Sequence, residues 1–263
     1  MRNILKVSAV MIAAILGVSG LWYGVPQSAN STHALTRPNE SKPSQAAYWH
    51  DVMDSELITP ANMDGKVSDG ILIGRGDAKK TLEIYLDPSC QVCAKFQEAV
   101  GEKIKKDIEE GKYRVRFIYG TITDGDLFAI REFGAKSSAK NALSSLGAAL
   151  NVSKNAFIEY QAALFSSTWH KEGSLDSFED DEYLIKIANT VPELRLNQDF
   201  RKHVRIGTFD RWSLGLSQSF EESGVPTTPT LIMSGKKITS NDGVSIPLTE
   251  AQFTAGIEMA LKG

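Results

Sequence analysis

The chain has 263 residues, of which 42% are hydrophobic and 23% are charged, and its formal net charge is −3. A chain of this length and composition can bury the core of one large domain or of two small ones. The nearly balanced charge gives no indication of a polyanionic partner, so we expect no nucleic acid to bind.

The first 26 residues predict an export segment. Arg2 and Lys6 flank the start of a charge-free, apolar stretch over 7–26, which contains Trp22 and Tyr23 near its end. Basic residues on the inner side and aromatic residues on the far side are typical of a segment that enters a membrane. Its length suits an uncleaved anchor or a cleaved signal peptide. Either way, we expect the remainder to be extracytoplasmic: held at the cell envelope or secreted.

Residues 27–65 predict a polar linker with one short helix. The stretch to about residue 47 is polar and rich in Ser and Pro, a composition that favours a flexible tether. Apolar residues within Tyr48–Ile58 then have the spacing of a short amphipathic helix.

The next elements predict a parallel strand–helix–strand unit. A short strand closed by a turn is expected within 69–77, and an apolar, β-branched strand over 81–87. The helix runs from Cys90 to about Glu110, with apolar residues at three- and four-residue spacing. A second core strand follows over 113–119. Because the helix is long enough for a crossover, the two strands should be parallel neighbours.

The remainder predicts a block of helices and then a return to sheet. Helices are expected over 127–150, 153–166, 180–190, 198–204 and 208–223, with Ser153 as an N-cap. Trp169, Trp212 and Phe165 are interpreted as core of this block. Strands are expected at 230–233 and 237–239, before a final helix over 249–261 with Thr249 as its N-cap.

Cys90 and Cys93 are the only cysteines of the chain, and they lie where the strand over 81–87 gives way to a helix. A disulfide between them closes a very short loop and therefore adds little stability. A zinc site usually takes four ligands, whereas the four histidines are scattered and are interpreted as surface residues, so no metal site is predicted. A thiol at a helix N-terminus is favoured as the nucleophilic thiolate, which leaves redox chemistry as the leading interpretation.

The order of elements, together with Cys90-Gln91-Val92-Cys93 and Gly224-Val225-Pro226-Thr227-Thr228-Pro229, resembles the DsbA-like branch of the thioredoxin superfamily. The resemblance covers about residues 66–263. It implies an α/β thioredoxin-like fold, with a central mixed sheet and a large helical subdomain inserted at about 124–223.

The resemblance also implies roles for six residues. Cys90 would form the mixed disulfide with substrate, and Cys93 would resolve it. Gln91 and Val92 would form the spacer of the active-site loop. Pro229 would follow a cis peptide bond and, with Thr228, bind an extended substrate segment. Pro226 is the competing candidate for the cis-proline, and an ordinary trans turn is the alternative to both.

Two positions depart from the family pattern. Strongly oxidising members carry His at the position of Val92, so we expect the pKa of Cys90 to lie below the free value of about 8.5 but well above the extreme of about 3.5. Members often bury an acid six residues before the first cysteine, where this chain has Ile84. Asp87 is interpreted as a strand-end or helix-cap residue, which leaves the proton acceptor for Cys93 unassigned.

These features predict a thiol–disulfide oxidoreductase that forms disulfides in unfolded or folding exported proteins and needs no cofactor. The resemblance implies re-oxidation by a membrane partner of the DsbB or vitamin K epoxide reductase type. A reductase or isomerase of the same fold is the alternative enzyme. A protein that binds Cu(I) through the two thiolates is the alternative of another class.

Overall fold

The computed structural model describes residues 45–124, 138–171 and 175–262. The predicted export segment, the linker up to residue 44 and residues 127–137 of a predicted helix lie outside the described residues. No helix in these described ranges is long and apolar enough to cross a membrane.

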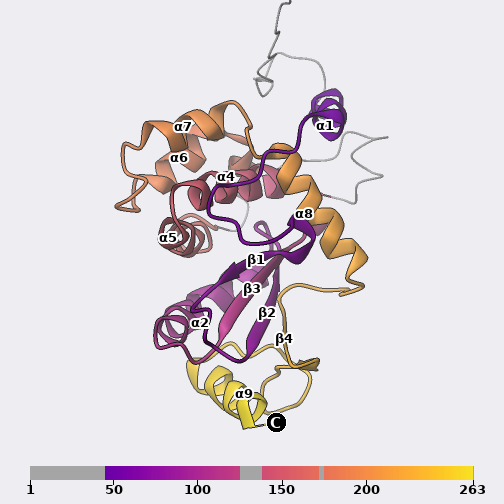
Figure 1. Cartoon of the computed structure of the whole chain (residues 1–263), viewed down its shortest axis with the longest axis vertical. Coiled ribbons are helices and arrows are strands. Elements are labelled where there is room, and N and C mark those ends of the chain that lie inside the picture. Colours follow the sequence, from indigo (N-terminus) through magenta and orange to yellow (C-terminus); the bar gives the residue numbers. More distant parts are fainter. Residues whose placement is uncertain (1–44, 125–137, 172–174, 263) are drawn as a thin grey trace, which may run out of the picture. The chain divides into compact units, whose positions relative to one another are not determined.

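Five strands of the described chain form one mixed sheet (Figure 1). The sheet has the order β1-β3-β2-β4-β5 and comprises β1 (Ile71–Ile73), β2 (Thr81–Leu86), β3 (Arg114–Tyr119), β4 (Thr230–Met233) and β5 (Lys236–Lys237). β2 and β3 are parallel, with Ile84 opposite Phe117, and the other pairs are antiparallel. The predicted crossover unit is therefore confirmed. The strand expected within 69–77 is real but shorter.

Helix α2 (Gln91–Glu109) connects β2 to β3 and carries the cysteine motif at its start. Its inner side is an apolar stripe that includes Phe96, Val100 and Ile104, all buried in the main core. Gly111 follows the helix with φ +72°, a backbone conformation that glycine adopts without steric cost. The helix ends where the sequence predicts.

The helical insertion lies between β3 and β4 and shares one core with the sheet. Its described elements are η2 (Ile122–Asp124), α4 (Ser138–Val152), α5 (Lys154–Leu164), η3 (Leu175–Glu179), α6 (Asp181–Ala188), α7 (Gln198–Arg205) and α8 (Asp210–Glu222). Phe117 of β3 and Phe157 of α5 meet edge to face at 5.7 Å. Ser153 caps α5 as predicted, since its side chain accepts a hydrogen bond from the Ala156 N–H at 2.8 Å. Figure 1 shows α4–α7 gathered beyond one end of the sheet.

The first and last helices complete the fold. α1 (Gln45–Asp54) begins and ends several residues earlier than predicted, and Trp49 packs with Leu214 of α8. η1 (Val67–Asp69) follows it. α9 (Glu250–Lys262) begins as predicted, because the Gln252 N–H donates to the Thr249 hydroxyl at 3.3 Å.

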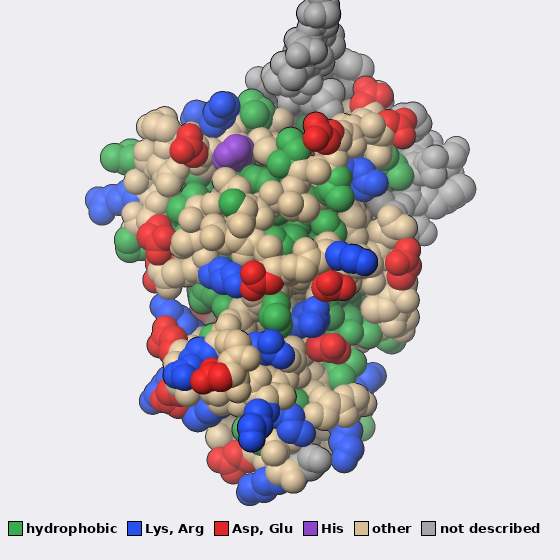
Figure 2. All heavy atoms as spheres, viewed as in Figure 1, with side chains coloured by type: hydrophobic (Ala, Val, Ile, Leu, Met, Phe, Trp, Pro, Cys, Tyr) green, Lys and Arg blue, Asp and Glu red, His purple; other side chains and the backbone are tan. Residues whose placement is uncertain are grey.

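Acidic and basic side chains are interspersed on the face shown in Figure 2. They do not gather there into one large patch of positive charge. Such a patch is typical of a surface that binds nucleic acid.

Candidate active site

The Cys90 thiol lies at the N-cap of α2, directly after β2. The Cys90 N–H donates to the Asp87 carbonyl oxygen at 3.0 Å, which closes a turn between strand and helix. The Cys93 N–H points back at the Cys90 sulfur across 3.4 Å. Since the first N–H groups of a helix have no intrahelical partner, this position provides donors to a thiolate.

The environment of Cys90 lowers its pKa to about 6. The largest cause is a hydrogen bond from the Cys93 thiol, which burial partly opposes, and the Cys93 N–H adds to the lowering. The value falls within the range expected from the sequence. Its cause differs, because the expectation rested on the helix amides alone, whereas the second thiol contributes most.

The Cys93 thiol is fully buried one turn further along α2. Burial raises its pKa well above the ordinary value, and the neighbouring Cys90 raises it further. The two thiols are therefore strongly unlike: one is an accessible thiolate near neutral pH, and the other keeps its proton. Both are in the reduced form in this structure.

Thr228 and Pro229 lie beside Cys90, although they are far away in the sequence. The Thr228–Pro229 peptide is the one cis bond among the described residues, and Pro226 is exposed in the preceding loop. The Cys90 thiol donates to the Thr228 carbonyl oxygen at 3.6 Å. The structure thus brings together the cysteines and the predicted cis-proline.

Gln91 and Val92 form the first turn of α2. Val92 is 43% exposed, and Gln91 is half-buried, with its amide nitrogen lacking a hydrogen-bond partner among the described residues. Val92 has no polar side-chain atom that could stabilise a thiolate. Any side chain that lowers the pKa of Cys90 therefore lies outside this spacer.

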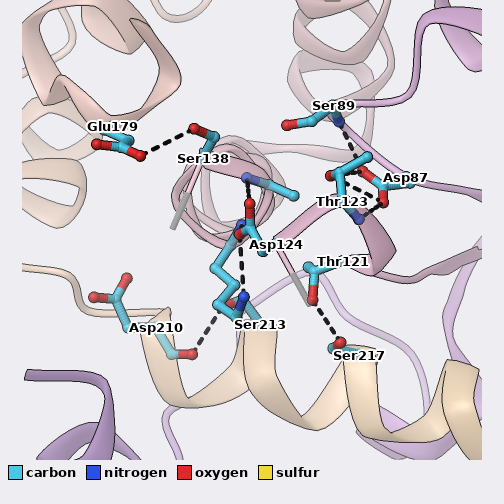
Figure 3. A network of polar contacts seen from close by, with 12 residues as sticks. Asp87, Ser89, Thr121, Thr123, Asp124, Ser138, Glu179, Asp210, Ser213 and Ser217 are labelled. Carbon is cyan, nitrogen blue, oxygen red and sulfur yellow. Dashed lines mark hydrogen bonds and ion pairs between the residues drawn. The ribbon is translucent and has the colours of Figure 1, made fainter. Parts of the chain in front are cut away.

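Asp87 directly follows β2, at the strand end where it was predicted, but its burial was not expected. The carboxylate accepts hydrogen bonds from the Ser89 N–H at 2.8 Å and from the Thr123 N–H at 3.0 Å (Figure 3). Burial raises the pKa of Asp87 to about 7, against these hydrogen bonds, and the charge of Cys90 adds to the rise. This places a titrating acid three residues before Cys90, whereas Ile84 occupies the family position.

A second buried acid, Asp124, lies against the first turn of α4 (Figure 3). It accepts hydrogen bonds from the Ala139 N–H at 3.1 Å and from the buried Lys140 ammonium at 3.1 Å. Burial raises the pKa of Asp124 and lowers that of Lys140. The pair anchors the start of the insertion close to Asp87, whose pKa the charge of Asp124 also raises.

His170 corrects the prediction that the histidines lie on the surface. It is only 4% exposed, because its ring is enclosed by Phe165 and Phe178 of the insertion. Its Nε2 atom lies 2.9 Å from the Pro88 carbonyl oxygen, in the loop before Cys90. The other histidine whose side chain is described, His203, is half-buried against Phe209. Within the described residues, no group of three or more His, Cys, Asp or Glu side chains could hold a metal ion.

The aromatic residues of the insertion lie as predicted. Phe165 and Trp212 are buried in the core, and Trp169 is partly buried at its edge.

The fold and the site together define a class of protein. A Cys-x-x-Cys motif opens the helix after a core strand, a cis-proline lies against its first thiol, and a helical insertion separates the two. These are the features of a thioredoxin fold of the DsbA-like type.

Comparison with known proteins agrees with this classification. The family model described as thioredoxin matches residues 66–258, and the chain belongs to this family. No curated protein matches the sequence.

Solved structures share the fold at low identity. MdbA from Actinomyces oris, described as a thiol–disulfide oxidoreductase, is 17% identical with a TM-score of 0.60, over 84% of this chain and 96% of that one. MdbA from Corynebacterium diphtheriae is 17% identical with a TM-score of 0.54, over 73% and 94%. BdbD from Bacillus subtilis is 17% identical with a TM-score of 0.55, over 80% and 100%.

Proposed function

We propose that this chain is an extracytoplasmic thiol–disulfide oxidoreductase that forms disulfides in exported proteins through Cys90 and Cys93. The observation that carries the proposal is the contrast between the two thiols. The pKa of Cys90 is lowered to about 6, and that of the buried Cys93 is raised. A stabilised Cys90 thiolate favours the reduced form of the pair, which makes the disulfide form an oxidant.

The reaction begins with Cys90 and Cys93 joined in a disulfide. A substrate thiolate attacks the Cys90 sulfur, the Cys90–Cys93 bond breaks, and Cys93 leaves as a thiolate that takes up a proton. A second substrate thiolate then attacks the substrate sulfur of the mixed disulfide, and Cys90 leaves as a thiolate. The substrate loses two electrons and gains a disulfide, and the enzyme gains the two electrons. The low pKa of Cys90 makes it a good leaving group in this step.

Thr228 and Pro229 supply a place for the substrate chain beside the reacting sulfur. The Thr228 carbonyl oxygen already lies 3.6 Å from the Cys90 sulfur. Backbone groups at this position can pair with an extended segment as one added strand, which does not depend on the sequence of that segment. This recognition suits an enzyme that accepts many unfolded or folding exported proteins.

The site of action is proposed from the N-terminal segment over 7–26. A charge-free apolar stretch after basic residues supports export, with the enzyme anchored in the membrane or released from it. Turnover then needs an oxidant that accepts two electrons from the Cys90–Cys93 dithiol. A membrane protein of the DsbB or vitamin K epoxide reductase type is the proposed partner.

A trapping experiment tests this function. In the full chain carrying Cys93→Ser, the Cys90 thiolate can still attack a disulfide of an exported protein, which breaks that disulfide and forms a mixed disulfide. The enzyme then has no second thiol to release the mixed disulfide, so exported cysteine-containing proteins should accumulate on Cys90 in cells. The matched control carries Cys90→Ser as well and should trap nothing. Absence of any exported protein on Cys90 contradicts the proposal. Copper bound at one ion per dithiol in the purified reduced protein, without exchange activity, supports the metal-binding alternative.

A further inference from the structure

His170 is fixed in place by the helical insertion. Its ring stacks on Phe165 at a centroid distance of 5.8 Å and meets Phe178 edge-on at 5.8 Å. Its backbone N–H donates to the Ser166 carbonyl oxygen at 2.8 Å, and this hydrogen bond closes the turn that follows α5. The position of the imidazole is therefore set by the insertion and not by the loop that it contacts.

The contact of His170 with the loop assigns the proton on its ring. The Nε2 atom lies 2.9 Å from the Pro88 carbonyl oxygen, and a carbonyl oxygen only accepts, so Nε2 carries the hydrogen. The Nδ1 atom is buried and has no partner among the described residues. Burial lowers the pKa of His170, which keeps the ring neutral near neutral pH.

The Pro88–Ser89 peptide is held at both of its polar ends. Its carbonyl oxygen accepts from His170 at 2.9 Å, and its N–H donates to the Asp87 carboxylate at 2.8 Å. Asp87 is tied in turn to the Thr123 N–H at 3.0 Å. Hydrogen bonds arranged in such a chain polarise and strengthen one another. Cys90 is the residue immediately after this fixed peptide.

We propose that His170 is a positioning residue for Cys90, so that the helical insertion, through the Pro88–Ser89 peptide, sets the reactivity of the Cys90 thiol. This inference rests on the proposed role of Cys90 as the residue that forms the mixed disulfide with substrate and then leaves as a thiolate. The Gln91–Val92 spacer offers no side-chain donor to the sulfur in this structure. His170 of the insertion constrains this loop instead, through its hydrogen bond to the Pro88 carbonyl oxygen.

Loss of the His170 donor leaves a buried carbonyl oxygen unpaired, an arrangement that proteins avoid. The Pro88–Ser89 peptide then moves toward water and takes Cys90 with it. The Cys90 sulfur is 3.4 Å from the Cys93 N–H, so a small displacement weakens this hydrogen bond. The thiolate loses stabilisation as a result.

Other titratable groups surround the loop and stay in place in the test. Asp87 precedes Cys90 in the same loop, and Cys93 lies in the first turn of α2. Asp124 of η2 and Lys140 of α4 lie on the elements packed against them. Because every variant keeps these four groups, a change in the titration of Cys90 reports on residue 170.

The test measures the thiolate absorbance of the reduced full chain as a function of pH. Cys90 titrates first, because the pKa of Cys93 is raised. His170→Phe keeps an aromatic ring but removes the donor, and we expect the Cys90 pKa to rise by about one unit, a tenfold change in the thiolate-to-thiol ratio. His170→Gln retains a donor near the Nε2 position, so the pKa of Cys90 in this variant should stay close to the wild-type value.

His203→Phe is the matched control. His203 is also packed on an aromatic ring, Phe209 at 5.3 Å, and bonds to Thr208 at 2.9 Å, away from the loop before Cys90. This variant should leave the Cys90 titration unchanged.

Two results overturn the proposal. One is a His170→Phe protein that melts at a lower temperature but titrates like the wild type, since His170 is then only structural. If that variant does not fold, the comparison passes to His170→Gln and His170→Asn, because the shorter Asn side chain does not reach the Nε2 position. Equal Cys90 pKa values in these two also overturn it. The titration needs no exported substrate, so it gives its answer even if trapping on Cys90 fails.

Discussion

Replacement of Asp87 by Asn should make the protein less stable in acid and more stable in base than the parent chain. Asp87 is completely buried, and its pKa is raised to about 7, chiefly by burial. The folded state therefore holds the proton of this carboxyl more tightly than the unfolded state does. Stability from this group is present in acid and falls as pH rises from about 4 to about 7.

The size of the effect follows from the shift in pKa. An unfolded Asp has a pKa of about 3.9, so the difference is about three units, or about 4 kcal/mol of lost stability above pH of about 7. Asn does not titrate and escapes this loss. It cannot replace the carboxylate as acceptor for both the Ser89 and Thr123 N–H groups, which costs about 1–3 kcal/mol at every pH.

Urea unfolding of the full chain over a series of pH values measures the difference. Cys90 also titrates, with a lowered pKa, and contributes stability that is lost as pH falls through about 6. Both chains should therefore carry Cys90→Ser, so that they differ at residue 87 alone. We expect the two stability curves to cross between about pH 4 and pH 7. A stability difference that stays constant over the whole pH range refutes the reasoning.

Three further outcomes are expected. Lys140→Met strands the buried Asp124 carboxylate and should lower the free energy of unfolding by about 3–5 kcal/mol, whereas adding Asp124→Asn should recover part of the loss in the same urea assay. Cys93→Ala removes the hydrogen bond that contributes most to the lowered pKa of Cys90, so alkylation of Cys90 should need a higher pH; an unchanged pH profile of the rate contradicts this. Gly207 has φ +63°, and in Gly207→Ala the added Cβ would press against the contact between α1 and α8, with about 1–3 kcal/mol of local strain. Limited proteolysis should therefore release α1 faster from this variant, and equal cleavage rates count against the reasoning.

The strand–helix–strand unit was predictable because local patterns determine it. β2 and β3 alternate between partly buried and buried residues in their first halves and become apolar and buried at successive residues in their last halves, and α2 shows a clear helical period. Ser153 and Thr249 likewise cap the helices that they precede. The pair Thr228 and Pro229 was identified through the family resemblance, since no local pattern shows which segment of a chain will lie beside Cys90.

The polar surroundings of the cysteines were not predictable in this way. Asp87 is at a strand end, where an exposed acid is common, and its burial depends on Thr123, 36 residues further along the chain. His170 contacts Pro88, 82 residues away, because the insertion folds back on the active-site loop. A single histidine in the turn that follows a helix gives no sign of such a contact. The tertiary packing of the insertion determines both.

The reduction potential of the Cys90–Cys93 pair is the most direct test of the account. The full chain is equilibrated with glutathione redox buffers, and the fraction of reduced dithiol is measured by alkylation, with Cys90→Ser as the unreactive control. A stabilised Cys90 thiolate predicts an oxidising potential between about −120 and about −180 mV. A value near about −270 mV, typical of a reductant, contradicts the proposed direction of the reaction.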